Sequence, residues 1–195
     1  YSNTTTVGGT ENSTTWTTTL PENQNITWNC LSYDNIAFNS WAISNYTLIT
    51  DTTTPSISYE TPTESDSGYL GHDYILINIS ASDTYLDNLT IYLYNSSGLV
   101  YSNTSSTSPL FVNYTNLPDG TYYFNSTTYD AAGNSNSSST RTITVDISNP
   151  TINFAGPYTS TGNYSQTYIE SNISASDDNL DTITIYLYNS TGLVQ

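Results

Sequence analysis

An internal repeat constrains the fold of this chain more than any other feature. Pro55 and Pro150 are the first residues of two similar sequence repeats that begin 95 residues apart. The clearest matches are 55–57 with 150–152, 78–83 with 172–177, and 89–94 with 183–188. A period of this length is a typical size for one domain and is too long for a solenoid unit. Each repeat is therefore predicted to be a self-contained domain with one modest core.

The two ends of the chain are predicted to be complementary halves of one domain. Asp34 matches Asp130, and the sequence around Asp34 matches the second half of the repeat. The C-terminal residues GLV at 192–194 match GLV at 98–100, which is followed by YSNT at 101–104. The chain itself begins with the same four residues, YSNT. The expected organisation is the C-terminal half of a domain at 1–54, a complete domain at 55–149, and an N-terminal half at 150–195 that the next unit completes.

The charge of the chain limits its partners. The formal net charge is −16, and the chain has one arginine and no lysine. A nucleic-acid-binding surface needs clustered Lys and Arg to neutralise phosphates, so nucleic acid is excluded as a partner. No run of about 20 apolar residues is present, so no membrane insertion is expected within this segment. The expected partners are copies of the chain itself, joined head to tail.

Acceptor sequences for N-linked glycans, Asn-x-Ser/Thr, are unusually dense. Glycosylation needs surface exposure, and several acceptors fall in predicted turns or at outward strand positions. The alternative is that these residues form an ordinary polar surface. Dense glycosylation implies an extracellular chain, and its combination with few basic residues points to an archaeal cell surface. The fourteen acceptors are Asn3, Asn12, Asn25, Asn45, Asn78, Asn88, Asn95, Asn103, Asn113, Asn125, Asn136, Asn163, Asn172 and Asn189.

The single cysteine, Cys30, excludes a disulfide within the unit. In the repeat register Cys30 matches Ser126, at an inward position of a predicted strand. A small buried thiol is therefore the expected role, in preference to a reactive or crosslinking one.

Period-two alternation of apolar residues predicts an all-β fold. The inward residues are predicted to be Ile75, Ile77, Ile79 and Ala81 in one strand and Leu89, Ile91 and Leu93 in the next. Strands are predicted at 55–60, 74–82, 88–95, 98–103, 109–115, 121–129 and 140–146. Clusters of Gly, Pro, Asn and Asp separate them. About seven short strands in each repeat are typical of an Ig-like β-sandwich, so the chain is predicted to hold tandem Ig-like domains, one complete and two half domains.

Two turn motifs carry a resemblance to a known family. The stretch LPDGTY at 117–122 leads into a strand that ends at DAAGN, residues 130–134. This arrangement resembles the F strand of Ig-like, fibronectin-III-like tandem-repeat domains in bacterial and archaeal cell-surface glycoproteins. The resemblance implies that Tyr122 is a tyrosine-corner residue whose hydroxyl bonds to the backbone near the preceding turn. Ile26 takes this position in 1–54, where the corner bond is not expected.

No catalytic activity is expected, because the resemblance implies a structural or adhesive role and the chemistry is missing. His72 is the only histidine, so neither a zinc site nor a nucleophile–base pair can be assembled around it. Calcium is the possible cofactor besides covalent glycans, since aspartates crowd two connections and supply hard oxygen ligands. The alternative is that they serve only as turn formers. The candidate ligands are Asp83, Asp87, Asp130, Asp177, Asp178 and Asp181.

The predicted function is structural. The chain is expected to be a repeat unit or subunit of a heavily glycosylated extracellular filament or cell-surface stalk, assembled head to tail. The alternative is an adhesin or carbohydrate-binding surface module that uses loops at one end of the sandwich. The two predicted half domains can be completed in two ways. Either the units are parts of one continuous polypeptide, or separate subunits complete each other by exchanging strands. We favour the continuous polypeptide, because an exchange would have to involve several strands at once.

Overall fold

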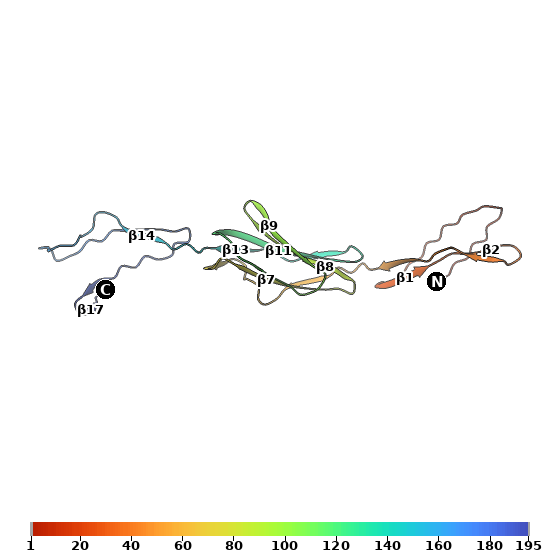
Figure 1. The fold of residues 1–195 in the computed structure, drawn as a ribbon, viewed down its shortest axis with the longest axis horizontal. Coiled ribbons are helices and arrows are strands. Elements are labelled where there is room, and N and C mark those ends of the chain that lie inside the picture. Colours follow the sequence, from red (N-terminus) through yellow and green to blue (C-terminus); the bar gives the residue numbers. More distant parts are fainter. Residues whose placement is uncertain (1, 195) are drawn as a thin grey trace.

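A computed structural model describes residues 2–194. The protein is an elongated, all-β molecule, with a central sandwich between an N-terminal segment, residues 2–54, and a C-terminal segment, residues 150–194 (Figure 1). The chain passes from one end of the molecule to the other, so that the two segments lie at opposite ends of the sandwich. In the described residues no helix is long and apolar enough to cross a membrane.

The first sheet of the central sandwich has three antiparallel strands in the order β10-β7-β5. The strands are β5 (Ser56–Tyr59), β7 (Ile75–Ser82) and β10 (Leu110–Tyr114). β7 lies in the middle, and every second side chain from Ile75 to Ala81 is buried. The predicted alternation in this strand is confirmed, because side chains in a strand point to opposite faces of the sheet.

The second sheet runs in the order β6-β13-β11-β8-β9, and β12 pairs with the far end of β11. Its two long central strands, β8 and β11, confirm the strands predicted at 88–95 and 121–129. β6 and β12 were not predicted, because the first is a three-residue segment beside glycines and the second contains only serine and asparagine. The strands are β6 (Gly68–Leu70), β8 (Leu86–Asn95), β9 (Gly98–Ser105), β11 (Gly120–Asp130), β12 (Ser135–Ser137) and β13 (Arg141–Val145).

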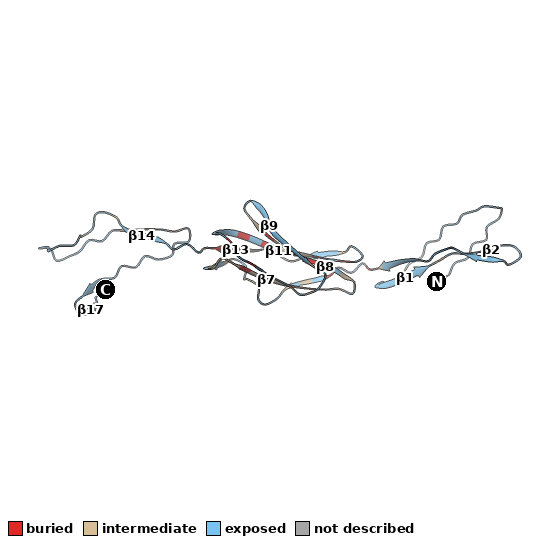
Figure 2. Cartoon of the chain, viewed as in Figure 1, coloured by how far each residue is buried: buried red, intermediate tan, exposed pale blue. Residues whose placement is uncertain are grey.

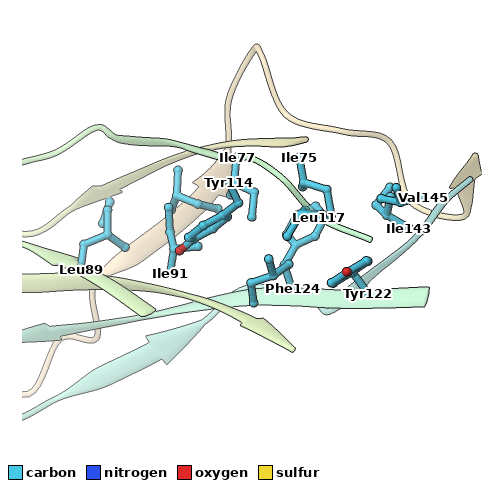
Figure 3. Packing of buried hydrophobic residues seen from close by; sticks show 13 residues of the cluster. Ile75, Ile77, Leu89, Ile91, Tyr114, Leu117, Tyr122, Phe124, Ile143 and Val145 are labelled. Carbon is cyan, nitrogen blue, oxygen red and sulfur yellow. The ribbon is translucent and has the colours of Figure 1, made fainter. Parts of the chain in front are cut away.

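One hydrophobic core lies between these two sheets (Figure 3). Figure 2 shows that buried residues gather in the central sandwich. Phe124 from β11 and Leu93 from β8 are fully buried in the core and pair across the sheet. The other buried members are Ile75, Ile77, Ile79, Ala81, Leu89, Ile91, Tyr114, Leu117, Tyr122, Ile143 and Val145.

The N-terminal segment forms two separate antiparallel pairs with no opposing sheet among residues 2–54. Its strands are β1 (Gln24–Trp28) with β4 (Tyr46–Thr50), and β2 (Leu31–Tyr33) with β3 (Asn39–Trp41). Ile26 lies opposite Leu48, as Tyr122 lies opposite Ile143 in the central sandwich. These strands therefore reproduce the register of β11, β12 and β13.

The C-terminal segment reproduces the other part of the sandwich. β14 (Thr151–Phe154) pairs with β15 (Ile173–Ser176), and β16 (Tyr188–Asn189) pairs with β17 (Gly192–Leu193). Ile152 lies opposite Ala175, as Ile57 lies opposite Ala81. The register of β14 and β15 is thus that of β5 and β7, and β16 and β17 repeat the hairpin of β8 and β9.

The structure corrects the prediction that Cys30 is buried. Its side chain is exposed, although Ser126, the matching residue of the central sandwich, is fully buried. The physical reason is the missing layer: Ser126 lies in a sheet that faces β7 and its neighbours, whereas no second sheet covers Cys30 within residues 2–54.

Candidate metal centre

Three carboxylates converge where the N-terminal segment joins the central sandwich. Oxygens of Asp51, Asp83 and Asp130 all lie within 4.8 Å of one another. Asp51 follows β4, Asp83 follows β7, and Asp130 is the last residue of β11. Three connections that are distant in sequence therefore meet at one end of the sandwich.

Asp130 is held by the turn that follows it. Its Oδ1 accepts hydrogen bonds from the backbone N–H groups of Ala132 and Asn134, both at 2.9 Å, and the Asn134 side chain donates to its Oδ2 at 2.7 Å. Burial raises the pKa of the Asp130 carboxyl, but the hydrogen bonds from Asn134 and the turn backbone outweigh burial and hold the pKa below its usual value. The group is therefore a carboxylate at neutral pH.

Asp51 is the least satisfied member of the cluster. Its side chain is 8% exposed, and its Oδ1 accepts a hydrogen bond from the backbone N–H of Thr53 at 2.9 Å. Its Oδ2 is buried and has no hydrogen-bond partner. A carboxylate oxygen that is removed from water without a donor carries a large desolvation cost, and such groups are rare in native proteins.

Hydrogen bonds between side chains and backbone groups connect the cluster to both sides of the junction. Asp83 Oδ1 accepts from the N–H of Tyr85 at 2.8 Å, and the Tyr85 hydroxyl donates to the carbonyl oxygen of Asn23 at 3.2 Å. The Asn134 side chain also donates to the carbonyl oxygen of Asp51 at 3.0 Å. The junction is thus a built contact and not a free linker.

The electrostatics of this cluster are unfavourable in the protein alone. The carboxylate oxygens lie within 4.8 Å of one another, and two like charges at that separation repel by about 3 kcal/mol at an effective dielectric constant of about 20. Arg141, the only arginine or lysine, stacks over the ring of Tyr59 at 4.0 Å and donates to the carbonyl oxygen of Glu64. No lysine or arginine in residues 2–194 is therefore available to compensate the three acids.

Only part of the predicted calcium ligand set converges. Asp83 and Asp130 meet as two members of the cluster, but Asp87 is exposed and accepts a hydrogen bond from the Asn88 side chain. Asp177, Asp178 and Asp181 form no such group among the described residues. Asp51 was not among the predicted ligands, because it follows a strand of the N-terminal segment and not one of the two connections in which the other aspartates lie. The one sequence signal for it was that Asp51 matches another aspartate, Asp146, in the repeat.

At the junction between the central sandwich and the C-terminal segment, Asp146 and Asp177 correspond to Asp51 and Asp83 of the cluster. Asp146 Oδ1 accepts from the N–H of Ser148 at 3.2 Å, as Asp51 Oδ1 does from Thr53. Asp177 Oδ1 accepts from the N–H of Asn179 at 2.9 Å, as Asp83 Oδ1 does from Tyr85. Here the Asn179 side chain donates to Asp146 Oδ2 at 2.7 Å.

The third position of this second set lies at the other end of the chain. Asp34, which matches Asp130, accepts hydrogen bonds on Oδ1 from the N–H groups of Ile36 at 3.0 Å and Phe38 at 2.9 Å. These are the bonds that Asp130 makes to Ala132 and Asn134. One complete set and one divided set of aspartates are therefore present in the chain.

The predicted glycan acceptors differ in exposure. Asn78, Asn88, Asn95 and Asn125 are half-buried. Asn78 is the most engaged, since its amide nitrogen donates to the carbonyl oxygen of Thr61 at 2.8 Å and its oxygen is buried without a partner. The exposed acceptors are Asn3, Asn12, Asn25, Asn45, Asn103, Asn113, Asn136, Asn163, Asn172 and Asn189.

His72 packs as a structural residue. Its ring stacks on Tyr74 with the ring centroids 3.8 Å apart, and Nδ1 lies 3.0 Å from the carbonyl oxygen of Tyr74. It takes no part in the aspartate cluster.

No family model and no curated protein matches the sequence. Among solved structures, the chain is similar to the fibronectin(III)-like modules of Clostridium thermocellum CbhA, with 21% identity, a TM-score of 0.33 and coverage of 64% of each chain. The central sandwich has an all-β, Ig-like fold. Two facing sheets, with the strand orders β10-β7-β5 and β6-β13-β11-β8-β9, enclose one core and establish this fold.

Two further structures are similar at the same low level. Domains d3-d4 of the rat CD45 extracellular region match with 16% identity and a TM-score of 0.37, over 72% of this chain and 75% of that chain. An engineered protein matches with 13% identity and a TM-score of 0.38, over 50% of this chain. The chain spans only 21% of the length of that engineered protein.

Proposed function

We propose that this chain is a structural unit of a glycosylated extracellular filament or cell-surface stalk, assembled head to tail. In the assembly, the C-terminal segment of one unit and the N-terminal segment of the next form one further Ig-like sandwich. The next unit is either a continuation of the same polypeptide or a second subunit. The proposal does not depend on which of the two supplies it.

The complementarity of the two segments carries this proposal. The N-terminal segment holds pairs with the register of β11, β12 and β13, and the C-terminal segment holds pairs with the register of β5, β7, β8 and β9. Neither segment repeats a pair that the other contains. Their positions at opposite ends of the molecule (Figure 1) allow identical units to join in a line, which is a heterologous, open mode of assembly.

Exposed apolar side chains support the same conclusion. Leu187 is 37% exposed and Ile185 is 51% exposed, whereas the matching Leu93 and Ile91 of the central sandwich are fully buried. Full burial of a side chain of this size stabilises by about 1.5–3 kcal/mol. Completion of the second sandwich would cover these residues, and it would also cover Cys30.

The surface properties fit a hydrated extracellular filament. The net charge of −16 keeps units soluble and self-repelling outside their junctions. Glycans on the exposed acceptors would add bulk and hydration without altering the core. The scarcity of lysine and arginine also removes cleavage sites for trypsin-like proteases.

Cys30 provides the test. A tandem protein that joins Gln195 of one copy to Tyr1 of the next contains two Cys30 thiols, and only the second would be covered by the newly formed sandwich. Ellman's reagent should therefore react rapidly with one thiol and at least tenfold more slowly with the other. Two equally reactive thiols in the folded tandem protein would overturn the proposal.

A pair of variants controls for indirect effects. Leu187→Asp in the first copy places a charge in the expected new core and should make both thiols reactive. Leu99→Asp, at an exposed position of β9, should leave the second thiol protected. Mixtures of single chains, measured over a concentration series, then show whether separate subunits associate in the same way.

A further inference from the structure

We propose that Asp51, Asp83 and Asp130 bind one calcium ion and that this ion fixes the N-terminal segment to the central sandwich. The inference goes beyond the assembly proposed above, because the site is complete within a single chain. It rests on the convergence of three carboxylates and on the unpartnered oxygen of Asp51.

The unpartnered oxygen points to a missing ligand. Asp51 Oδ2 is buried beside two other acids and receives no hydrogen bond. Turn formation alone explains the positions of the three Oδ1 atoms of Asp51, Asp83 and Asp130, since each accepts a hydrogen bond from the backbone N–H two residues later. It does not explain why a second carboxylate oxygen is buried without a donor. A cation between the three groups supplies the missing partner and offsets their repulsion.

The geometry and ligand type favour calcium. Ligand oxygens around one Ca²⁺ lie 2.3–2.6 Å from the ion, so two opposite ligands are about 4.6–5.2 Å apart. The 4.8 Å span of the cluster is compatible with one such ion. All three ligands are carboxylates, and neither histidine nor cysteine is present to favour zinc. Mg²⁺ prefers shorter bonds and keeps several of its waters, which suits a buried carboxylate cluster less well.

The position of the site determines its effect. Asp51 lies near the end of the N-terminal segment, directly after β4, whereas Asp83 and Asp130 belong to the sandwich. An ion held by all three joins the two parts directly. Without it, the three negative charges repel one another, and the hydrogen bonds from Tyr85 and Asn134 to the N-terminal segment hold the junction alone. Calcium is thereby expected to stiffen this connection.

The test uses the whole chain, freed of metal and titrated with CaCl₂. Isothermal titration calorimetry should give one ion per chain, and Tb³⁺ should show luminescence sensitised by nearby tyrosines such as Tyr85. Small-angle X-ray scattering should show a narrower distribution of particle lengths with calcium than with a chelator. Saturation with MgCl₂ should reproduce these effects only weakly.

Matched variants decide whether this cluster is responsible. Asp83→Asn keeps an acceptor for the Tyr85 N–H but removes a charge, and it should weaken calcium binding at least tenfold. Asp87→Asn, four residues away and outside the cluster, should bind as the unaltered protein does. Asp51→Ser tests the buried ligand without creating the acceptor sequence that asparagine would create there.

Two outcomes would overturn the inference. One is absence of calcium binding at millimolar concentrations by the folded chain. The other is equal binding by the Asp83→Asn, Asp51→Ser and Asp87→Asn variants. Neither outcome depends on assembly, so failure here would leave the Cys30 experiment and its conclusion untouched.

Discussion

The Tyr122 hydroxyl donates a hydrogen bond to the carbonyl oxygen of Pro118, four residues earlier in the chain, at 3.0 Å. The ring of Tyr122 is 3% exposed, so the bond closes the turn before β11 from inside the core. This is the tyrosine-corner bond that the family resemblance implied. Its counterpart in the N-terminal segment is absent, because Ile26 has no hydroxyl group.

Loss of this bond should destabilise the central sandwich. Tyr122→Phe removes only the hydroxyl and leaves the Pro118 carbonyl oxygen without that donor. The free energy of unfolding is expected to fall by about 1 kcal/mol, as for a typical neutral hydrogen bond. Urea denaturation measures the change, with Tyr123→Phe on the exposed face of the same strand as the control. Equal midpoints for the two variants would contradict a stabilising corner.

Matched leucines should respond differently to truncation. Leu93→Ala creates a cavity in the closed core and is expected to cost about 2–5 kcal/mol, whereas Leu187→Ala in the single chain should cost well under 1 kcal/mol. In the tandem protein, Leu187→Ala in the first copy should destabilise the newly formed sandwich by an amount that approaches the Leu93 effect. Thermal unfolding of both proteins provides the comparison. A neutral Leu187→Ala in the tandem protein would argue against a closed second core.

Alkaline pH should destabilise the sandwich through Tyr114. Burial raises the pKa of Tyr114 to about 12. The unfolded chain loses this proton near pH 10 and the folded chain only near pH 12, so stability is intact below pH 10 and falls as pH rises through this window. The loss is on the order of 1 kcal/mol by pH 11. Thermal unfolding between pH 9 and 11.5 should show a shallower decline for Tyr114→Phe, and an unchanged slope would contradict the assignment.

Glycan occupancy should follow side-chain freedom. Asn113 is exposed on the edge strand β10 and is expected to carry a glycan. Asn78 is half-buried, and its amide bonds to the carbonyl oxygen of Thr61, so it is expected to remain unmodified. Mass spectrometry of intact glycopeptides from the native source measures both sites. Full occupancy at Asn78 would show that the Thr61 contact yields to the glycan.

Assembly should create further calcium sites. Asp146 and Asp177 lie at one end of the chain and Asp34 at the other, in local turns that match those of the complete cluster. If calcium binds the single chain at one site, the tandem protein should bind three ions, because its internal junction unites the divided set. Calorimetry counts them. Two ions together with a protected Cys30 would confirm assembly and contradict the additional site.

Local pattern was sufficient to predict much of this structure. The alternation in 75–81 placed the inward face of β7 correctly, because the two-residue period of a strand is a local property. The turn residues before and after β11 predicted its limits, whereas the Tyr122 bond was an implication of the family resemblance that these turns carry. β12 escaped prediction because its three polar residues pair with β11 without any apolar signal of their own.

The sequence by itself determined the repeat, the strands and their inward faces, since each depends on neighbours within a few residues. Only the tertiary structure decided the rest. Asp51 meets Asp83 and Asp130 because three distant connections end at one edge of the sandwich, and no local spacing encodes that meeting. Cys30 is exposed for a related reason: burial depends on the presence of an opposing sheet, which is a property of the assembled layers and not of the strand that carries the thiol.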